Sequence, residues 1–479
     1  MHLKKITLIN FRCFTKLEIN LHPRLTVLVG VNGAGKTAVL DGIATALSPV
    51  LTHLSSAHQR LTGRGIKDTD FRIESLAGRG GKERWGIADY SQVVAETPDG
   101  LTWDYWRPSS SNKEPLEKHG GKQLKEYMQS ILESYRTATP ALTPVFAYYG
   151  ARRGYIDVPE RLRGAKENYA HPTSALIGAL NSLSDFREML AWFDQEESSE
   201  LRANKGLPSS NFAHSKALTA VRAAVVSLLG GAFKNPHFNS AHKFVLERED
   251  GGAPMLASQL SQGYQSMLAL AMDFSRRLAI ANSHLVGDDA HVSNGSEDAG
   301  QQLDLLGSDS DPAVELHASP PSAMSAPAIM LVDEIDLHLH PVWQQRVLLD
   351  LMRTFPKTQF IVTTHSPQVL TSVKAECVRG LKWEKDKFVV KDDYQFSEGA
   401  EAQLALEDIL GAPPRPENLA VVKKLKAYLE LIENDQWDSP TAAKLRTELD
   451  EWGRGHESAL LKADMDIRMR QFRRDKAIG

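Results

Sequence analysis

A glycine-rich stretch near the N-terminus has the residue types and the spacing of a phosphate-binding loop. It reads Gly-Val-Asn-Gly-Ala-Gly-Lys-Thr from Gly30 to Thr37 and fits the pattern G-x-x-x-x-G-K-[ST]. Glycines let backbone N–H groups turn toward an anion at the positive end of a helix. We expect Lys36 to reach the β- and γ-phosphates of ATP, and the Thr37 hydroxyl to bind Mg²⁺. The ligand-binding residues predicted in this loop are Asn32, Gly33, Gly35, Lys36 and Thr37.

An acidic pair follows an apolar run much later in the chain. Residues 328–332 (Ala-Ile-Met-Leu-Val) lead directly into Asp333 and Glu334. Asp333 stands where a buried strand ends, which suits a ligand of Mg²⁺, and Glu334 is placed to act as general base toward water. A strand that ends in Asp-Glu is by itself a common surface feature. Together with the glycine-rich loop, however, the pair predicts hydrolysis of ATP.

Two further features could contact the γ-phosphate. Ser261 and Gly263 open an amphipathic helix, and serine and glycine at a helix N-terminus form an anion site. The glycine-rich loop already holds one phosphate chain, so this second site suggests a phosphate bound from another subunit; an ordinary N-cap serine is the alternative. His365 follows another buried run, residues 359–363, and is expected to sense the γ-phosphate. Its alternative role is that of a hydrogen-bonded histidine at the end of a loop.

The elements around these motifs indicate a mixed α/β fold. Continuous apolar runs at 25–29, 328–332 and 359–363 are typical of strands buried on both faces, and residues 38–47 have helical spacing. Most of the stretch from about 121 to 230 is helical in pattern, apart from a strand-like run that ends at Gly150. The predicted parts are 1–106 and 231–400 as two halves of one head, 107–230 as an inserted helical lobe, and 401–479 as a helical partner-binding region.

The bulk composition excludes several classes of protein. In 479 residues the net charge is −4, so any contact with nucleic acid would need a local basic patch. Two cysteines, Cys13 and Cys377, indicate a reducing compartment rather than a disulfide framework. The N-terminus does not read as a signal peptide, and no apolar run is long enough to cross a bilayer. We therefore expect a cytoplasmic protein without a membrane partner.

Two segments have unusual charge. Residues 281–327 contain eight acidic residues and no lysine or arginine, which predicts a disordered acidic insertion. A DNA mimic or a tether for a partner is the alternative. The C-terminus carries a cationic run that could meet DNA phosphate or an acidic partner, or could be a solvated tail. This run consists of Arg468, Arg470, Arg473, Arg474 and Lys476.

In this order the four motifs resemble the ATP-binding-cassette (ABC) ATPases of the SMC, Rad50 and RecF group. Residues 6–14 resemble the opening strand of that group, in which an arginine at the position of Arg12 commonly reaches the phosphates. The resemblance implies that residues 260–265 are the signature motif, Asp336 lies in the D-loop, and His365 is the switch histidine. It also implies an ABC-type ATPase head, two copies of which sandwich two ATP molecules between them.

In such a sandwich Ser261 of one head faces the glycine-rich loop of the other. The family also has a Q-loop glutamine that couples the lobe to the nucleotide, and Gln92 is one candidate for it. The stretch 148–153 is another place where the lobe could couple to the nucleotide.

A narrower resemblance rests on residues 333–344, 360–370 and 406–416. These stretches resemble the OLD-like and PtuA-like ATPases of bacterial anti-phage systems, such as Septu and certain retrons. The resemblance implies a sensor or regulatory subunit, forming a homodimer or a higher oligomer and working with a separate nuclease of HNH type. Nucleic acid would be contacted directly or through a retron RNA or DNA. No acidic nuclease cluster follows His365, so cleavage is expected from the partner.

Several other interpretations stay open. A RecF-like DNA-binding ATPase of repair or replication is the main alternative, and a transporter subunit is disfavoured because the signature lacks its usual second glycine. His338 and His340 could bind a metal, although this spacing beside the D-loop is more simply a mark of the subgroup. Finally, one cluster faintly resembles an HNH nuclease but lacks its hairpin and helix. This cluster is His237, Asn239 and His242.

Overall fold

The computed structural model has two compact units, Met1–Ala405 and Leu406–Gly479. It describes residues 1–56, 59–77, 83–110, 113–151, 169, 171–182, 186–208, 211–285, 322–385 and 387–478. The core of the predicted acidic insertion, residues 286–321, lies outside the described residues. At its two ends the chain forms short 3₁₀ helices, Ser283–Leu285 and Ser322–Ser325. The two units are considered separately below.

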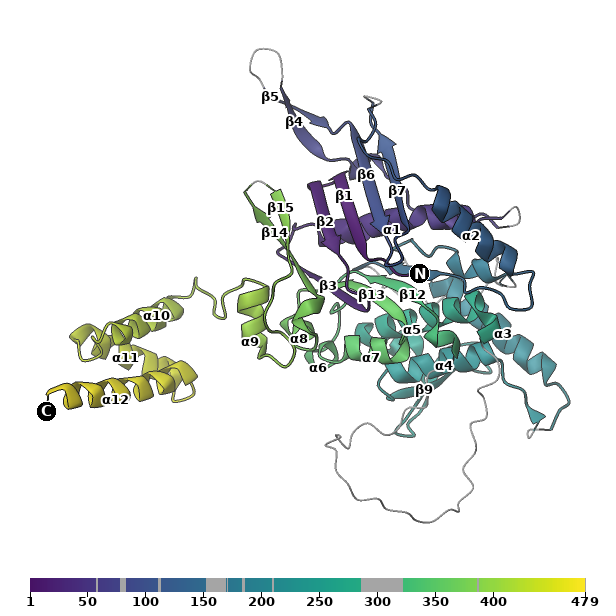
Figure 1. Cartoon of the computed structure of the whole chain (residues 1–479). Coiled ribbons are helices and arrows are strands. Elements are labelled where there is room, and N and C mark those ends of the chain that lie inside the picture. The colour runs from purple at the N-terminus through teal and green to yellow at the C-terminus, as the bar shows by residue number, and fades with distance from the viewer. Residues whose placement is uncertain are drawn as a thin grey trace, which may run out of the picture. The chain divides into compact units, whose positions relative to one another are not determined.

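A six-stranded sheet forms the centre of the first unit (Figure 1). Its strands, in spatial order, are β15 (Lys387–Lys391), β14 (Val378–Glu384), β3 (Leu25–Val29), β13 (Thr358–Thr363), β12 (Ala328–Val332) and β8 (Val145–Tyr149). All neighbouring strands are parallel except β14 and β15. The strands β3, β8, β12 and β13 are buried at every residue, as their apolar runs predict. Because the strands are parallel, the loops that follow β3, β12 and β13 meet at one edge of the sheet.

A four-stranded antiparallel sheet lies over the central one. It has the order β2 (Phe14–Asn20), β1 (Lys5–Phe11), β6 (Tyr90–Glu96), β7 (Thr102–Pro108). Helix α1 (Lys36–Leu54) lies between the two sheets and shares one hydrophobic core with both. By length and composition α1 could cross a membrane, but 78% of it is buried as a core helix. Strand β7 extends past residue 106, so the predicted end of the first part falls inside this strand.

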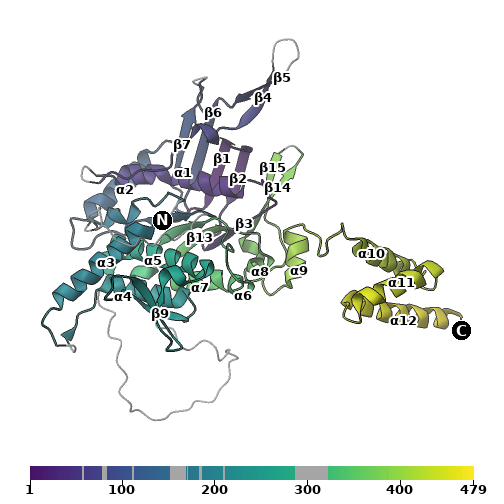
Figure 2. The same ribbon diagram turned by 180° about the vertical axis from the view of Figure 1, so that it is seen from behind.

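Helices α3 (Phe186–Ala203), α4 (Lys216–Leu228), α5 (Gln262–Ala281) and α7 (Val347–Thr354) cover the other face of the central sheet, whereas α2 (Lys122–Ser134) packs against α1 and β7 (Figure 2). Helix α5 packs against β8, α4 and α3. The other elements are the hairpin β4 (Ile73–Ala77) and β5 (Glu83–Ile87), and the small sheet of β9 (Phe233–Phe238), β10 (Phe244–Arg248) and β11 (Met255–Leu256). Short helices follow the central strands: α6 (Pro341–Gln344), α7, α8 (Pro367–Leu370) and α9 (Ala402–Leu404). The predicted α/β head with mixed and parallel sheets is confirmed.

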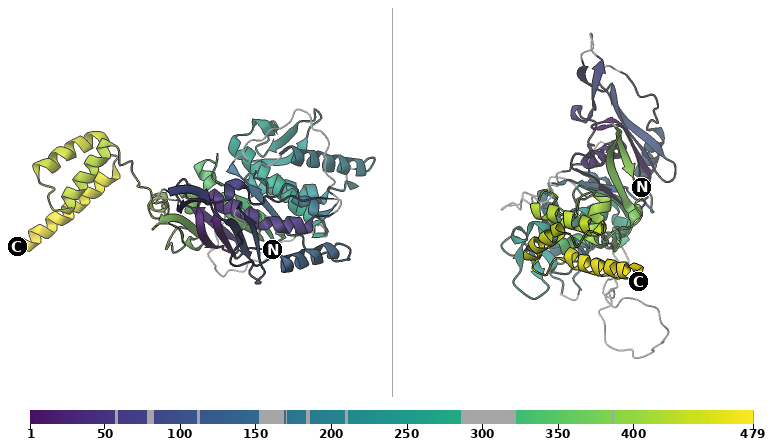
Figure 3. Two further views of the ribbon diagram at one scale, coloured as in Figure 1. Left: turned by 90° about the horizontal axis from the view of Figure 1, so that it is seen from above. Right: turned by 90° about the vertical axis from the view of Figure 1, so that its left-hand side faces the viewer.

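The second unit consists of helices packed side by side (Figure 3). They are α10 (Ala420–Glu433), α11 (Pro440–Gly453) and α12 (Ser458–Ile478). Their small core contains Leu425, Tyr428, Ile432, Ala442, Leu449, Leu460 and Ala463. The predicted C-terminal helical region is therefore present as a small bundle with its own core.

Candidate nucleotide site

The glycine-rich loop connects β3 to α1 and depends on its glycines for its shape. Gly30, Gly33 and Gly35 have φ angles of 152°, 82° and 89°. A Cβ on Gly35 would lie 2.4 Å from Cζ of Phe14, and a Cβ on Gly30 would lie 2.7 Å from the carbonyl oxygen of Leu381. No side chain fits at these two positions, so the backbone itself lines the loop. The loop ends at the N-terminus of a long helix, where unpaired N–H groups favour an anion.

Lys36 is held inside this loop. Its ammonium donates to the carbonyl oxygens of Gly30 (2.9 Å) and Val31 (3.3 Å), and the side chain is largely buried. Burial lowers the pKa of Lys36, and the negative charge of Asp333 opposes that shift. A partly desolvated cation within a ring of backbone groups suits the binding of a polyphosphate.

Asp333 connects three neighbouring strands through hydrogen bonds. Oδ2 accepts from the Thr37 hydroxyl (2.9 Å) and Oδ1 from the Thr363 hydroxyl (2.7 Å). The N–H of Asp333 donates to the carbonyl of Tyr149 (2.8 Å) on the other side. A hydroxyl and a carboxylate within hydrogen-bond distance are hard oxygen donors of the kind that Mg²⁺ prefers. These two side chains therefore fit the cation that accompanies ATP.

Glu334 and Asp336 are fixed by the threonines at the end of β13. Glu334 has a φ of 50°, a left-handed conformation that is uncommon outside glycine, and its N–H donates to the Thr363 hydroxyl (2.7 Å). Asp336 Oδ1 accepts from the Thr364 hydroxyl (2.6 Å) and from the N–H of His365 (3.4 Å). The structure thus brings together the predicted base, the D-loop aspartate and the switch histidine. Sequence reasoning missed the two threonines, whose only signal was a polar pair that closes an apolar strand.

The predicted signature motif begins α5, as the sequence indicated. Ser261 is the N-cap residue, is exposed, and makes no capping bond with its side chain. Gly263 is buried, and a Cβ there would lie 2.7 Å from the carbonyl oxygen of His338. Gly263 therefore permits close contact with the segment that follows Asp336. Among the described residues, Ser261 makes no hydrogen bond to the glycine-rich loop of its own chain.

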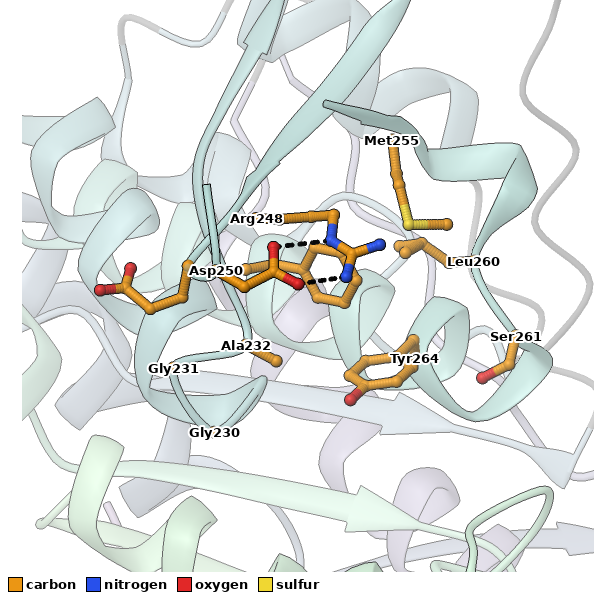
Figure 4. Close-up of a pocket in the computed structure, with 11 residues that line it drawn as sticks. Gly230, Gly231, Ala232, Arg248, Asp250, Met255, Leu260, Ser261 and Tyr264 are labelled. Carbon is orange, nitrogen blue, oxygen red and sulfur yellow. Dashed lines mark hydrogen bonds and ion pairs between the residues drawn. The ribbon is translucent and has the colours of Figure 1, made fainter. Parts of the chain in front are cut away.

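A pocket of about 730 Å³ opens beside Ser261 (Figure 4). Its lining is mainly apolar, including Phe233, Leu260 and Tyr264. At its rim Arg248 Nε and Asp250 Oδ1 lie 2.9 Å apart. The pocket therefore continues the surface around Ser261. Arg248 and Asp250 pair with each other at its rim, so neither brings an unpaired charge.

Arg12 lies in a cluster of alternating charges beside α1. Its guanidinium pairs with Asp41 (2.6 Å) and with Asp70 (2.9 Å), and Arg64 pairs with the same two acids at 3.3 and 2.8 Å. Burial alone would raise the pKa of Asp70, but hydrogen bonds from Arg64 and its neighbours hold that pKa below its ordinary value. The structure thus places Arg12 against Asp41 on α1. A contact of Arg12 with phosphate stays a prediction.

The two places considered for the Q-loop differ in position. Gln92 lies in β6, where its amide donates to Asp104 (2.7 Å) and to the carbonyl of Glu117 (2.8 Å). These bonds hold it within the antiparallel sheet. The other stretch begins in β8 and ends at the edge where Asp333 lies, but residues 152–168 are outside the described ones. Position therefore favours the end of β8 over Gln92.

The histidines considered as metal or nuclease residues have local structural roles. His340 caps α6 by accepting from the N–H of Val342 (3.4 Å). Asn239 closes the turn after β9 by accepting from the N–H groups of Ala241 and Lys243. Across the described ranges, no three His, Cys, Asp or Glu side chains gather as a metal site would require.

A buried network that the sequence did not reveal ties the signature helix to β8. The Tyr149 hydroxyl donates to Asp273 on α5 (2.9 Å), which also accepts from Arg277 (2.7 Å) and Arg276 (2.8 Å). Burial would raise the pKa of Asp273, but the two arginines hold it well below its ordinary value. Tyr149 also accepts the N–H of Asp333 through its carbonyl. One residue therefore joins α5 to the catalytic edge of the sheet.

Comparison with known proteins agrees with this geometry. Residues 5–204 match the family model of an AAA domain. The chain is 24% identical over 488 residues to the retron Vc95 ATPase of Vibrio cholerae serotype O1 biovar El Tor, covering 91% of this chain and 85% of that protein. It is 26% identical over 540 residues to the retron Ec83 ATPase of Escherichia coli, covering 98% and 87%. The Septu protein PtuA of Bacillus thuringiensis is 33% identical over 87 residues, covering 17% of this chain and 22% of that protein.

The chain is an ATPase, similar to those of retron and Septu systems. This similarity agrees with the resemblance seen in residues 333–344 and 360–370. It binds a nucleotide, and we expect the glycine-rich loop with Asp333 and Glu334 to supply the groups that ATP hydrolysis needs.

Proposed function

We propose that two copies of this ATPase close head to head around ATP and so regulate a separate effector subunit of an anti-phage complex. In each site Lys36 and the loop N–H groups bind the phosphates, while Thr37 and Asp333 hold Mg²⁺. Glu334 takes a proton from the attacking water, and His365 contacts the γ-phosphate. Arg12 and Asp336 are the other residues that we assign to the nucleotide. Bound Mg²⁺ supplies charge neutralisation, and the chain supplies position and the base.

The observation that carries the ATP site is the convergence at one sheet edge. Thr37, Asp333 and Thr363 come from three segments of the chain, yet two hydrogen bonds of 2.9 and 2.7 Å join them. Glu334 is fixed to the same threonine. These hydrogen bonds fix the predicted cation ligands and the predicted base relative to each other, without a contribution from the nucleotide.

Ser261 supports the second copy. It is an exposed N-cap residue whose hydroxyl makes no hydrogen bond to the first turn of α5. Two residues later, Gly263 packs closely against the backbone of His338. The unpaired N–H groups of that turn favour an anion that its own loop does not provide. The negatively charged phosphates of a nucleotide bound to the glycine-rich loop of a second copy would suit these N–H groups.

Complementation between two inactive variants tests the shared site. Lys36→Ala removes phosphate binding in its own loop, and Ser261→Arg blocks the site of the partner, so each alone is expected to be inactive. In a mixture, half of the dimers would be mixed and each would have one intact site, which restores up to about a quarter of normal turnover. Mixtures that stay inactive would contradict the shared site.

Glu334→Gln tests the predicted base. The variant should retain ATP binding, measured by equilibrium dialysis, and lose turnover; unchanged turnover would remove Glu334 as the base.

The role in defence is proposed from the relatives, which belong to retron and Septu systems. We propose that the effector is a nuclease, of HNH type, and that nucleic acid is contacted directly or through a retron RNA or DNA. Co-production with the protein encoded beside this chain, followed by mass measurement of the purified complex, tests this proposal. Salt-dependent binding of duplex DNA by the chain alone, without any partner, would instead favour a RecF-like role in repair or replication.

A further inference from the structure

Helix α12 of the second unit has two apolar faces, and the core of the unit uses only one of them. Leu460, Ala463 and Ile467 point into the small core shared with α10 and α11. A second set lies at large exposure: Leu461 is 55% exposed, Met465 68%, Met469 58% and Phe472 69%. We call these four residues the outer stripe of α12. Such large apolar side chains on one helix are unusual at a surface that only meets water.

The outer stripe is one continuous face of the helix. At 3.6 residues per turn its four members fall within about 80° of one another, roughly opposite the core-facing residues. The steps between them are four, four and three residues, which is the spacing of a helix seam. A stripe of this width fits between the side chains of one partner helix, whereas helices that lie in a bilayer surface present a broader apolar face.

The charges beside the stripe select the kind of partner. Lys462, Arg468 and Arg473 flank it, are exposed, and form no ion pair with any described residue. The acids nearby are already used, because Asp464 binds Arg446 (3.0 Å) and Asp466 binds Arg470 (3.0 Å). The rim of the stripe is therefore positive.

A second copy of α12 does not suit this rim. Two such helices packed stripe to stripe would bring cations toward cations, which destabilises a helix pair. An acidic rim on the partner would instead form ion pairs on both sides of the apolar seam, and charge complementarity of this kind sets which partner is accepted.

We propose that the outer stripe of α12 is the docking surface for an amphipathic helix of another protein, whose apolar stripe is flanked by Asp or Glu. This inference deepens the proposed function and rests on it, since it gives the effector subunit an attachment point on the ATPase. Methionines at two of the four positions adapt their shape to an incoming side chain.

A designed helix provides the direct test. The probe is a fluorescein-labelled 21-residue peptide with leucines at the stripe spacing and glutamates on both rims, titrated with the full-length chain and followed by anisotropy. The variant Met465→Gln/Phe472→Gln is expected to bind it at least about tenfold more weakly, as expected for the central residues of an interface. Leu116→Gln, which alters a side chain that is 97% exposed elsewhere, is the matched control and should bind normally. Equal binding by the two variants would refute the docking surface.

Charge reversal separates the contribution of the rim from that of the stripe. Arg468→Glu/Arg473→Glu should lose affinity for the glutamate-flanked peptide and gain it for a lysine-flanked one. No change of preference would contradict the acidic partner. Two further measurements test the other possible occupants. Self-association of the chain that disappears in Met465→Gln/Phe472→Gln would overturn the proposal. Binding to phosphatidylglycerol vesicles that disappears in the same variant would also overturn it.

The complex itself gives the final comparison. When the chain is co-produced with the protein encoded beside it, Met465→Gln/Phe472→Gln should lose that protein while ATP turnover and ATP-dependent dimerisation remain. Retention of the protein by this variant would refute the docking surface. An unaltered chain that neither dimerises with ATP nor retains a partner would refute the proposed function, which is a distinguishable result.

Discussion

Replacing Gly263 by alanine tests whether contact between the signature helix and the D-loop matters for catalysis. The new Cβ would lie 2.7 Å from the carbonyl oxygen of His338. Ordinary contacts between carbon and a carbonyl oxygen are about 3.3–3.6 Å, so one segment must move by roughly 0.6–0.9 Å. The carbonyl oxygen of His338 belongs to the backbone, which cannot rotate away as a flexible side chain would. The movement therefore falls on the segment between Asp336 and His338, or on the start of α5.

The expected effect is on the rate rather than on stability. A misplacement of about 1 Å near reacting groups can lower a rate by about a hundredfold, so we expect kcat to decrease by about tenfold to a hundredfold. Alanine is favoured over glycine inside a helix by about 1 kcal/mol, which offsets part of the strain in the folded state. KM for ATP should change little, because the glycine-rich loop is untouched.

Steady-state ATP hydrolysis and thermal unfolding measure the two effects on the same sample. Gly121→Ala is the matched control for turnover, because a Cβ there has only Nε2 of His53 within 4 Å, at 3.8 Å, and kcat should not change. Gly121 is the N-cap residue of α2, so this control is expected to lower Tm rather than raise it. Normal turnover by Gly263→Ala, with a raised Tm, would show that the contact gives way freely. The reasoning about this contact would then be wrong.

Two buried networks give further predictions. Asp273→Asn leaves Arg277 buried without its counter-charge, which should lower the free energy of unfolding by about 3–5 kcal/mol, measured by urea denaturation. Because the folded-state pKa of Asp273 is depressed, its stabilisation is complete above the ordinary aspartate pKa of about 3.9 and declines as the pH falls below it. The stability difference between the variant and the unaltered chain should therefore shrink in acid, and a constant difference would contradict the ion pairs. Thr363→Val keeps the shape but removes both the donor to Asp333 and the acceptor for Glu334, so ATP turnover should fall by at least about tenfold, with Thr363→Ser retaining most of it. Equal activity of the valine and serine variants would show that these hydrogen bonds do not position the site.

The parts of the site that could be predicted lie next to each other in sequence. The strands β3, β12 and β13 are buried at every residue and are built around apolar side chains, and each ends directly before the residues with chemistry. Buried parallel strands have this pattern, so the strand and its loop could be recognised together. The start of α5 after Ser261 was predictable for the same local reason.

The remaining contacts join residues that are far apart in sequence. The bond from Tyr149 to Asp273 spans 124 positions, and a tyrosine in an apolar strand reads as ordinary packing. Arg12 reaches Asp70 across 58 positions. Such pairings depend on tertiary structure, which one sequence without an alignment does not contain.

The cationic run at the C-terminus shows how helix geometry divides a pattern that looks uniform. Arg470 pairs with Asp435 (2.8 Å) and Arg474 with Asp438 (3.1 Å), so both face the connection between α10 and α11. Arg468 and Arg473 point elsewhere because each residue turns by about 100° around the helix. The four arginines of this run therefore do not face one common direction.

The strand order of the central sheet has a consequence for synthesis of the protein. Leu25 of β3 pairs with Phe360 of β13, and β12 and β13 both lie between β3 and β8. During translation β3 and β8 leave the ribosome long before the two strands that separate them exist. The early strands are mainly apolar and are fully buried in the folded protein, so the nascent chain must keep them from aggregating until more than three hundred residues have been made. We therefore expect slow folding of the first unit, a need for chaperones during expression, and no nucleotide binding by nascent chains that end before β13.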